Sequence, residues 1–184
     1  MSRYKLTKTV VMVGMMGAGK TAVGTALAHL IGVPFIDSDA QIEEAANMTI
    51  AEIFSTYGEA FFRDKESLVL SRLLDESPSI LSTGGGAFLQ TSNREMISER
   101  GLSVWLKADR NLLWARVKHK TTRPLLRVPD PKGKLFDLLE AREPSYRLAG
   151  LTVEADANYS VQDMAQKVLE GLLDHPLGVL EKVT

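Results

Sequence analysis

Short apolar runs alternate along this chain with segments in which apolar residues recur every three or four positions. The short runs predict buried strands, and the longer spacing predicts amphipathic helices. Strands are predicted at 9–13, 33–36, 79–82, 103–106 and 151–154. Helices are predicted at about 21–31, 39–46, 50–57, 58–74, 92–99, 110–118, 134–147 and 161–173. Strands separated by helices imply βαβ units, so we expect a three-layer α/β/α fold around a mostly parallel sheet.

The 184 residues suit one domain with its own core, because no repeat, low-complexity tract or linker divides them. The segment 120–133 differs from its surroundings: it lacks apolar periodicity, is basic and contains three prolines. Such a segment predicts a loop. The first eight residues are a short polar lead into the first strand, and a tail at about 174–184 extends past the last predicted helix.

The composition excludes several classes of function. Lysine and arginine together number 22, and aspartate and glutamate number 23, so the net charge is −1. No overall basic field therefore favours nucleic acid or an anionic membrane. The absence of cysteine excludes disulfides, thiolate metal sites and cysteine nucleophiles. Since no signal peptide or membrane-length apolar run is present, we expect a cytoplasmic protein.

The most specific motif is the segment 14–21, Gly-Met-Met-Gly-Ala-Gly-Lys-Thr, which fits the phosphate-binding pattern G-x-x-x-x-G-K-[ST] at every fixed position. Its glycines let the backbone curl so that consecutive N–H groups face an anion. Lys20 adds a cation for the β- and γ-phosphates, and the Thr21 hydroxyl can bind Mg²⁺. A predicted strand precedes the motif and a predicted helix follows it. The sequence therefore predicts a site for a nucleoside triphosphate.

Two aspartates follow the second predicted strand. Mg²⁺–ATP chemistry usually needs a carboxylate near the metal, but the third strand ends in 82–86, Ser-Thr-Gly-Gly-Gly, with no acid. On an extended segment Asp37 and Asp39 would lie on the same side, one for the metal and one for an acceptor hydroxyl. The alternative is that they only cap the next helix. Because a cap needs one such residue, we expect a functional role for at least one aspartate.

Three consecutive glycines and three arginines complete the candidate set. The glycines at 84–86 cost backbone entropy, which favours a turn whose bare N–H groups approach a ligand over a plain flexible turn. Arg63, Arg123 and Arg142 carry guanidinium groups, which suit carboxylates and phosphates. Each arginine alone is better explained as a solvated surface residue. The sequence does not show whether the three converge.

Together these elements resemble the shikimate kinase family, small P-loop kinases of the nucleoside-monophosphate-kinase type. The likeness runs from about Thr9 to about Leu173. It rests on six elements in this order: 14–21, Phe-Ile-Asp-Ser-Asp at 35–39, Gly-Glu-Ala-Phe-Phe-Arg at 58–63, Ser-Thr-Gly-Gly-Gly at 82–86, Arg-Pro-Leu-Leu at 123–126 and Arg-Glu-Pro-Ser-Tyr at 142–146. The resemblance implies a parallel-sheet P-loop kinase fold, with a substrate-binding helical region at about 39–75 and a mobile lid at about 120–133.

The resemblance also implies an activity. It is the ATP-dependent phosphorylation of the shikimate 3-hydroxyl, which gives shikimate 3-phosphate and ADP and serves chorismate and aromatic amino-acid biosynthesis. The tail after Leu173 lies outside the matching region, and we assign it no function.

Individual residues acquire roles from the same resemblance. The residues implied to bind ATP are Gly17, Ala18, Gly19, Lys20, Thr21, Ala22, Arg116, Arg123 and, near the adenine, Asn158. The residues implied to bind shikimate are Asp39, Arg63, Gly84, Gly85, Gly86 and Arg142. Thr21 and Asp37 would hold Mg²⁺, the latter largely through water. Lys20, Asp39 and Arg123 would be catalytic, with Asp39 accepting the reacting proton and Arg123 closing over the transferring phosphoryl group.

Two other functions stay open at this point. A gluconate or nucleoside-monophosphate kinase would share the phosphate-binding loop and the lid. It would not explain why Asp39, Arg63, the triple glycine and Arg142 all match shikimate-type elements. A nucleotide-gated regulatory protein would bind nucleotide without acceptor-dependent turnover. We expect ATP and shikimate as small-molecule partners, no nucleic acid or membrane partner, and a monomer.

Overall fold

A parallel sheet lies at the centre of the molecule, which a computed structural model describes over residues 3–120 and 126–184. Its strand order is β3-β4-β2-β5-β6, and all neighbours are parallel. The strands are β2 (Thr9–Val13), β3 (Phe35–Asp37), β4 (Ile80–Ser82), β5 (Gly101–Lys107) and β6 (Leu151–Glu154). The predicted α/β fold is confirmed, although β3 begins at Phe35 rather than 33 and β5 at Gly101 rather than 103.

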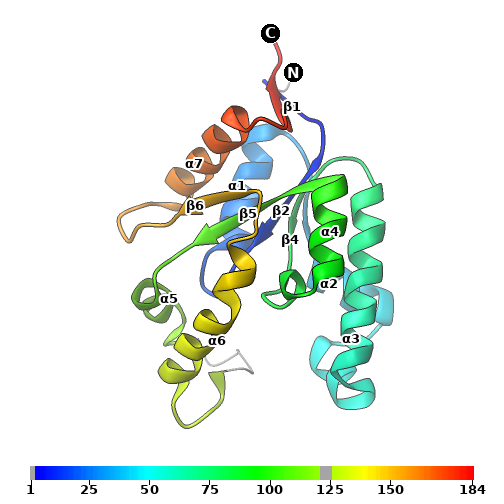
Figure 1. Cartoon of the computed structure of the whole chain (residues 1–184), viewed down its shortest axis with the longest axis vertical. Helices are drawn as coiled ribbons and strands as arrows, with labels where there is room; N and C mark the ends of the chain where they lie inside the picture. Colours follow the sequence, from blue (N-terminus) through cyan, green and yellow to red (C-terminus); the bar gives the residue numbers. More distant parts are fainter. Residues whose placement is uncertain (1–2, 121–125) are drawn as a thin grey trace.

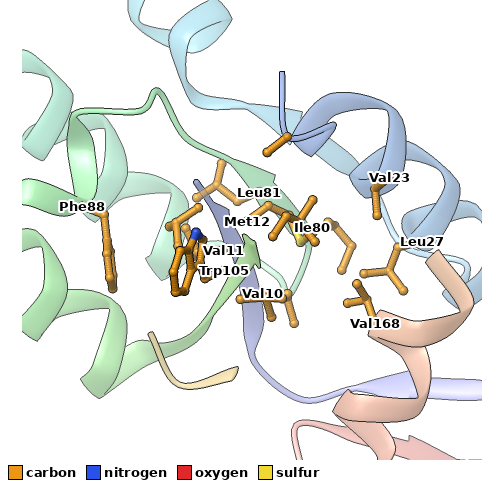
Figure 2. Close-up of a cluster of buried hydrophobic side chains, with 14 of the residues drawn as sticks. Val10, Val11, Met12, Val23, Leu27, Ile80, Leu81, Phe88, Trp105 and Val168 are labelled. Carbon is orange, nitrogen blue, oxygen red and sulfur yellow. The ribbon is translucent and has the colours of Figure 1, made fainter. Parts of the chain in front are cut away.

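The central strand shows why this sheet forms. Every residue of β2 is buried, as expected for a strand of a parallel sheet that helices cover on both faces. Figure 2 shows Val23, Leu27 and Val168 on one side of the strands and Phe88 and Trp105 on the other. All five side chains belong to the hydrophobic core. The apolar run of the strand is therefore satisfied by two layers of helices.

The helices are arranged around this sheet in two groups (Figure 1). They are α1 (Lys20–Ile31), α2 (Ser38–Ala46), α3 (Ile50–Asp75), α4 (Thr91–Arg100), α5 (Arg110–Val117), α6 (Pro131–Tyr146) and α7 (Val161–Asp174), with a short 3₁₀ helix η1 (Ala87–Leu89). Helices α1 and α7 pack together, and α1 also contacts β4. On the other side α4 packs against β5 and α3, while α6 contacts η1. These contacts give the predicted three layers.

Helix α3 joins two helices that the sequence predicts separately, at 50–57 and 58–74. The break between them is at Gly58, where φ is 85° and ψ is 175°. Glycine adopts this backbone conformation without the steric cost that a Cβ would add. No helix in the two described ranges is both long and apolar enough to cross a membrane.

The two ends of the chain form a second, small sheet that the sequence did not predict. Strand β1 (Tyr4–Leu6) pairs antiparallel with β7 (Leu180–Lys182). The tail is also part of the core, because Val179 and Leu180 are buried. Three-residue strands offer too few positions for a period of two to be visible. The pairing itself joins opposite ends of the chain, which no local pattern reports.

The segment 120–133 differs in part from the predicted loop. Helix α6 begins at Pro131 rather than 134 because Asp130 caps it, accepting a hydrogen bond from the Gly133 N–H at 3.1 Å. Proline is favoured at the first helical position, where no N–H partner is required. Leu126 is buried in the core. Residues 121–125, including Arg123, lie outside the described residues, so the lid stays a prediction.

Candidate active site

The carboxyl ends of the parallel strands meet at one edge of the sheet, and the predicted site residues follow them there. The phosphate-binding loop follows β2, Asp37 ends β3, and the glycine turn 84–86 follows β4. Ligands of open α/β sheets bind at this edge. The order of the elements alone thus brings these three segments together.

The phosphate-binding loop has the backbone that its glycines were expected to provide. Gly14, Gly17 and Gly19 all have positive φ, and Gly19 precedes the first residue of α1. A Cβ on Gly17 would come within 2.7 Å of the Val117 Cγ1 atom, so this glycine is also required by packing. The loop delivers the N-terminus of a 12-residue helix to the site. Such an end presents N–H groups and a partial positive charge, which suit a phosphate.

Two cations lie against this loop. The Lys20 ammonium donates to the Gly14 carbonyl at 2.6 Å and to the Met15 carbonyl at 3.0 Å. Arg116, from α5, donates to the carbonyls of Gly17 and Ala18 at 3.1 and 3.3 Å. Two of the three cations predicted on the nucleotide side, Lys20 and Arg116, are therefore at the loop.

Asn158 is the residue that was predicted to lie near the adenine. Asn158 is exposed in the turn after β6, where its N–H donates to Asp156 at 2.8 Å. That contact lies within the turn, so it does not connect Asn158 with the loop. Its role at the adenine stays a prediction.

The two aspartates have different environments, which corrects one expectation. They do not lie on an extended segment, because α2 begins at Ser38 and Asp39 is in its first turn. Asp37 is the cap: its Oδ1 atom accepts from the N–H groups of Asp39 at 2.9 Å and Ala40 at 3.4 Å. The capping alternative is thus correct for Asp37. It leaves Asp39 as the aspartate that capping does not explain.

Asp39 has the properties of a functional carboxylate. Its Oδ1 atom is buried without a hydrogen-bond partner among the described residues. Burial first, and then the charge of Asp37, raise the pKa of Asp39 to about 6, while Lys20 and Arg63 lower it. Such a buried, unsatisfied oxygen is costly unless a ligand supplies a partner.

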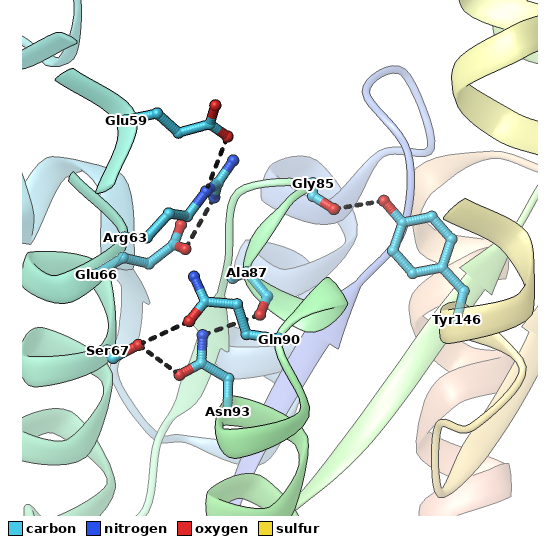
Figure 3. Close-up of polar contacts among 9 residues, drawn as sticks. All are labelled: Glu59, Arg63, Glu66, Ser67, Gly85, Ala87, Gln90, Asn93 and Tyr146. Carbon is cyan, nitrogen blue, oxygen red and sulfur yellow. Dashed lines mark hydrogen bonds and ion pairs between the residues drawn. The ribbon is translucent and has the colours of Figure 1, made fainter. Parts of the chain in front are cut away.

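Arg63 is held by two carboxylates on its own helix (Figure 3). Its Nη1 atom lies 2.9 Å from Glu66 Oε1, and its Nε atom lies 3.6 Å from Glu59 Oε1. Glu66 is 2% exposed, and burial raises its pKa although the hydrogen bond and charge of Arg63 oppose that shift. The guanidinium is therefore fixed at the site by a buried partner.

Each glycine of the turn lies against a different charged side chain. A Cβ on Gly84 would come 3.1 Å from both carboxylate oxygens of Asp39. On Gly85 it would come 2.6 Å from Nη1 of Arg142, and on Gly86 it would come 2.5 Å from Nη2 of Arg63. The charged side chains thus lie against the bare backbone, in space that larger residues would occupy.

Two residues without a predicted role support this cluster. Glu66 binds Arg63, and Tyr146 donates a hydrogen bond to the Gly85 carbonyl at 2.6 Å. Glu66 follows Arg63 by three positions and Tyr146 follows Arg142 by four, so each pair shares one helix face. This spacing from a predicted arginine could have identified both residues from the sequence.

Magnesium would have to be held by few protein groups. No group of three or more His, Asp or Glu side chains with metal-ligand spacing occurs in the part of the chain that the structure describes. The donor set of Thr21 and Asp37 is nevertheless chemically suitable, because Mg²⁺ prefers oxygen ligands and commonly keeps waters and substrate phosphates in its shell. Thr21 is exposed at the start of α1, and Asp37 is half-buried at the same edge.

Comparison with known proteins agrees with this geometry. Residues 16–173 match the family model described as shikimate kinase. The chain is 63% identical over 167 residues to the shikimate kinase of Ruegeria pomeroyi, covering 91% of this chain and 86% of the relative. It is 62% identical over 172 residues to that of Cereibacter sphaeroides, covering 94% and 86%.

A solved structure gives the same result. It is the shikimate kinase from Acinetobacter baumannii in complex with shikimate, which superposes with a TM-score of 0.85 at 43% identity. The match covers 92% of this chain and 95% of that one. The chain described here belongs to the shikimate kinase family.

Proposed function

We propose that the residues at the carboxyl edge of the sheet transfer a phosphoryl group from ATP to the 3-hydroxyl of shikimate, giving shikimate 3-phosphate and ADP. As a member of this family the chain is an ATP-using kinase that acts on shikimate. The observation that carries the site assignment is the glycine turn, with Asp39, Arg142 and Arg63 against its three successive residues. One carboxylate and two guanidinium groups around bare amides suit a small acid that carries hydroxyls.

On the nucleotide side, the loop amides from Gly17 to Thr21, together with Ala22, would receive the phosphates. Lys20 would place its charge at the β- and γ-phosphates, where negative charge shifts during transfer. Arg116 would lie at the adenine side of the loop, with the segment near Asn158. Mg²⁺, held by Thr21 and through water by Asp37, would neutralise phosphate charge when bound.

On the acceptor side, Arg63 and Arg142 would bind the shikimate carboxylate. Guanidinium groups bind carboxylates through parallel, charge-assisted hydrogen bonds. Gly84–Gly86 would let the ring approach because no side chain intervenes. Asp39 would accept a hydrogen bond, and then the proton, from the reacting hydroxyl. With a pKa of about 6 it is mostly ionised at neutral pH, which suits a general base.

The predicted lid completes this proposal. Arg123, within 120–133, would close over the transferring phosphoryl group only when both substrates are bound. Closure would exclude water, so that ATP is transferred rather than hydrolysed. We further propose that the protein is cytoplasmic. We also propose that it is a monomer, since one chain supplies every residue of the proposed shikimate site.

The deciding experiment is a coupled assay of ADP formation with shikimate, gluconate, a nucleoside monophosphate or no acceptor. Of these acceptors, we expect only shikimate to support rapid ADP formation. Lys20→Ala should form almost no ADP in the same assay. Faster turnover with gluconate or the monophosphate would assign the site to another small-molecule kinase. Nucleotide binding without turnover on any acceptor would favour a regulatory protein instead.

A further inference from the structure

The phenol of Tyr146 lies where the phosphate-binding loop and the glycine turn meet. It is fully buried at the end of α6, and its ring packs against Trp105 with a centroid distance of 5.9 Å. Its hydroxyl donates to the Gly85 carbonyl at 2.6 Å and lies 3.9 Å from the Met15 sulfur of the loop. One side chain therefore contacts both the nucleotide and the acceptor segments.

The same hydroxyl lies beside Arg142, one helical turn earlier. A Cβ on Gly85 would come 2.6 Å from the Arg142 Nη1 atom and 3.4 Å from the Tyr146 hydroxyl oxygen, so both groups lie at this glycine. Burial raises the pKa of Tyr146, while the charge of Arg142 opposes that shift. A tyrosine hydroxyl can accept one hydrogen bond while it donates another, so the hydroxyl that donates to the Gly85 carbonyl can also accept one from Arg142.

Holding the Gly85 carbonyl also fixes the N–H group of Gly86. Both groups belong to one planar peptide unit, and the described residues contain no cis peptide bond, so the two point in opposite directions. Figure 3 shows the Gly85 carbonyl directed at Tyr146, with Arg63 on the other side of the turn. The Gly86 N–H is therefore aimed away from Tyr146.

We infer that Tyr146 is a positioning residue for the acceptor: its hydroxyl sets Arg142 and the Gly85–Gly86 peptide in the arrangement that binds shikimate. It acts through these two groups and does not touch the reacting atoms. The inference rests on the proposed function, which places Arg142 and the turn at the shikimate carboxylate and ring.

Tyr146→Phe tests this directly, because it removes one oxygen and keeps the ring that packs in the core. We expect the shikimate Kd to rise about tenfold, the effect of losing one buried hydrogen bond, while the ATP Kd stays unchanged. Both constants can be measured by calorimetry. The KM for shikimate should rise more than kcat falls.

A second variant separates positioning from general destabilisation. Ser103 on β5 is buried, and its hydroxyl accepts a hydrogen bond from the Gly150 N–H at 2.9 Å. Ser103→Ala therefore also breaks a buried hydrogen bond to backbone, but at a place outside the proposed site. It should lower the unfolding midpoint as Tyr146→Phe does while leaving the shikimate Kd unchanged. An equal rise in the shikimate Kd for both variants would overturn the inference.

A double-mutant cycle with Arg142 distinguishes positioning from a purely structural role. The measured quantity is the effect of Tyr146→Phe on the shikimate Kd with and without Arg142. In an Arg142→Ala background, Tyr146→Phe should weaken shikimate binding clearly less than in the wild type, because one of the groups it holds is gone. Full additivity of the two effects would contradict the inference.

Two further results keep the proposals apart. If wild-type protein turns over shikimate but Tyr146→Phe binds it normally, only this inference fails. If wild-type protein neither binds nor phosphorylates shikimate, the proposed function fails and the inference with it. Should Tyr146→Phe not fold, the wild type can be labelled at the Cζ atoms of its four tyrosines. Shikimate should then shift the Tyr146 resonance, assigned by replacing the other three, and an unshifted signal would overturn the inference.

Discussion

Replacing Asp39 with asparagine should make the protein more stable and less active at neutral pH. Asparagine has almost the same shape but carries no charge, so it resembles the protonated aspartate. The structure gives the reason for the stability effect: burial, and then the neighbouring charge of Asp37, raise the pKa of Asp39 from 3.8 to about 6. A raised carboxyl pKa means that the folded state disfavours the ionised form.

The size and pH dependence of the effect follow from this shift. Below about pH 4 Asp39 is protonated in both the folded and unfolded states, so its ionisation costs no stability. As the pH rises to about 6, the unfolded state has already released the proton, and the folded state must ionise a half-buried group. The wild type therefore loses up to about 3 kcal/mol of unfolding free energy across this window, from a shift of about two pKa units. Asp39→Asn avoids that loss.

Urea denaturation at pH 5 and pH 7.5 measures the difference. Asp39→Asn should be more stable than the wild type at both values, and by more at pH 7.5. Asp109→Asn is the matched control, since Asp109 is the exposed N-cap of α5 and asparagine caps a helix equally well. It should leave the unfolding free energy almost unchanged. Equal stability of Asp39→Asn and wild type at pH 7.5 would show that the folded state does not disfavour the ionised form of Asp39.

Activity should respond in the opposite direction. Loss of a general base typically lowers kcat by about 100- to 10,000-fold. In the wild type, kcat/KM for shikimate should fall below about pH 6, where Asp39 becomes protonated, and this fall should be missing from the residual activity of Asp39→Asn. A wild-type profile that is flat from pH 5 to pH 8 would remove Asp39 from the proton transfer.

Three other predictions address the rest of the site. Lys20→Ala should lower kcat about 100- to 1000-fold in a protein that still folds, because one preorganised charge at the phosphates is lost; near wild-type turnover would contradict the assignment. Gly85→Ala should raise the shikimate Kd as Arg142→Ala does, and leave ATP binding and stability nearly unchanged, since its Cβ displaces only the flexible end of Arg142. Calorimetry and thermal unfolding decide it, and a lower ATP affinity would place the turn on the nucleotide side. Arg123→Ala should lower turnover strongly while shikimate binding alone hardly changes. Hydrogen exchange across 120–133 should slow when shikimate and an unreactive ATP analogue bind together, and equal protection in both states would refute the lid.

The local patterns of this chain were sufficient for its architecture. Continuous apolar runs predicted the five strands of the central sheet, because a strand that is buried on both faces consists of consecutive apolar residues. Apolar residues spaced three or four positions apart predicted the helices. The break at Gly58 was likewise predicted as a helix boundary. The errors occurred where structure depends on distant partners or on one cap. The β1–β7 pairing has no periodicity to reveal it, and α6 starts early because Asp130 caps it.

Within the site, the phosphate-binding loop could be predicted from local sequence, since the spacing of its residues sets the backbone curl and places the lysine without help from the rest of the chain. It also supplied the candidate acids, glycines and arginines, but each arginine alone was better explained as a surface residue. The fold was needed to show that Asp37 is a cap and that Asp39 is a half-buried acid whose Oδ1 atom is buried and unsatisfied. Only the packing of α2, α3 and α6 around the turn after β4 set Asp39, Arg63 and Arg142 against three successive glycines. The electrostatic environment and burial of a residue depend on neighbours that are distant in sequence. The sequence therefore identifies the candidate groups but does not show which of them come into contact.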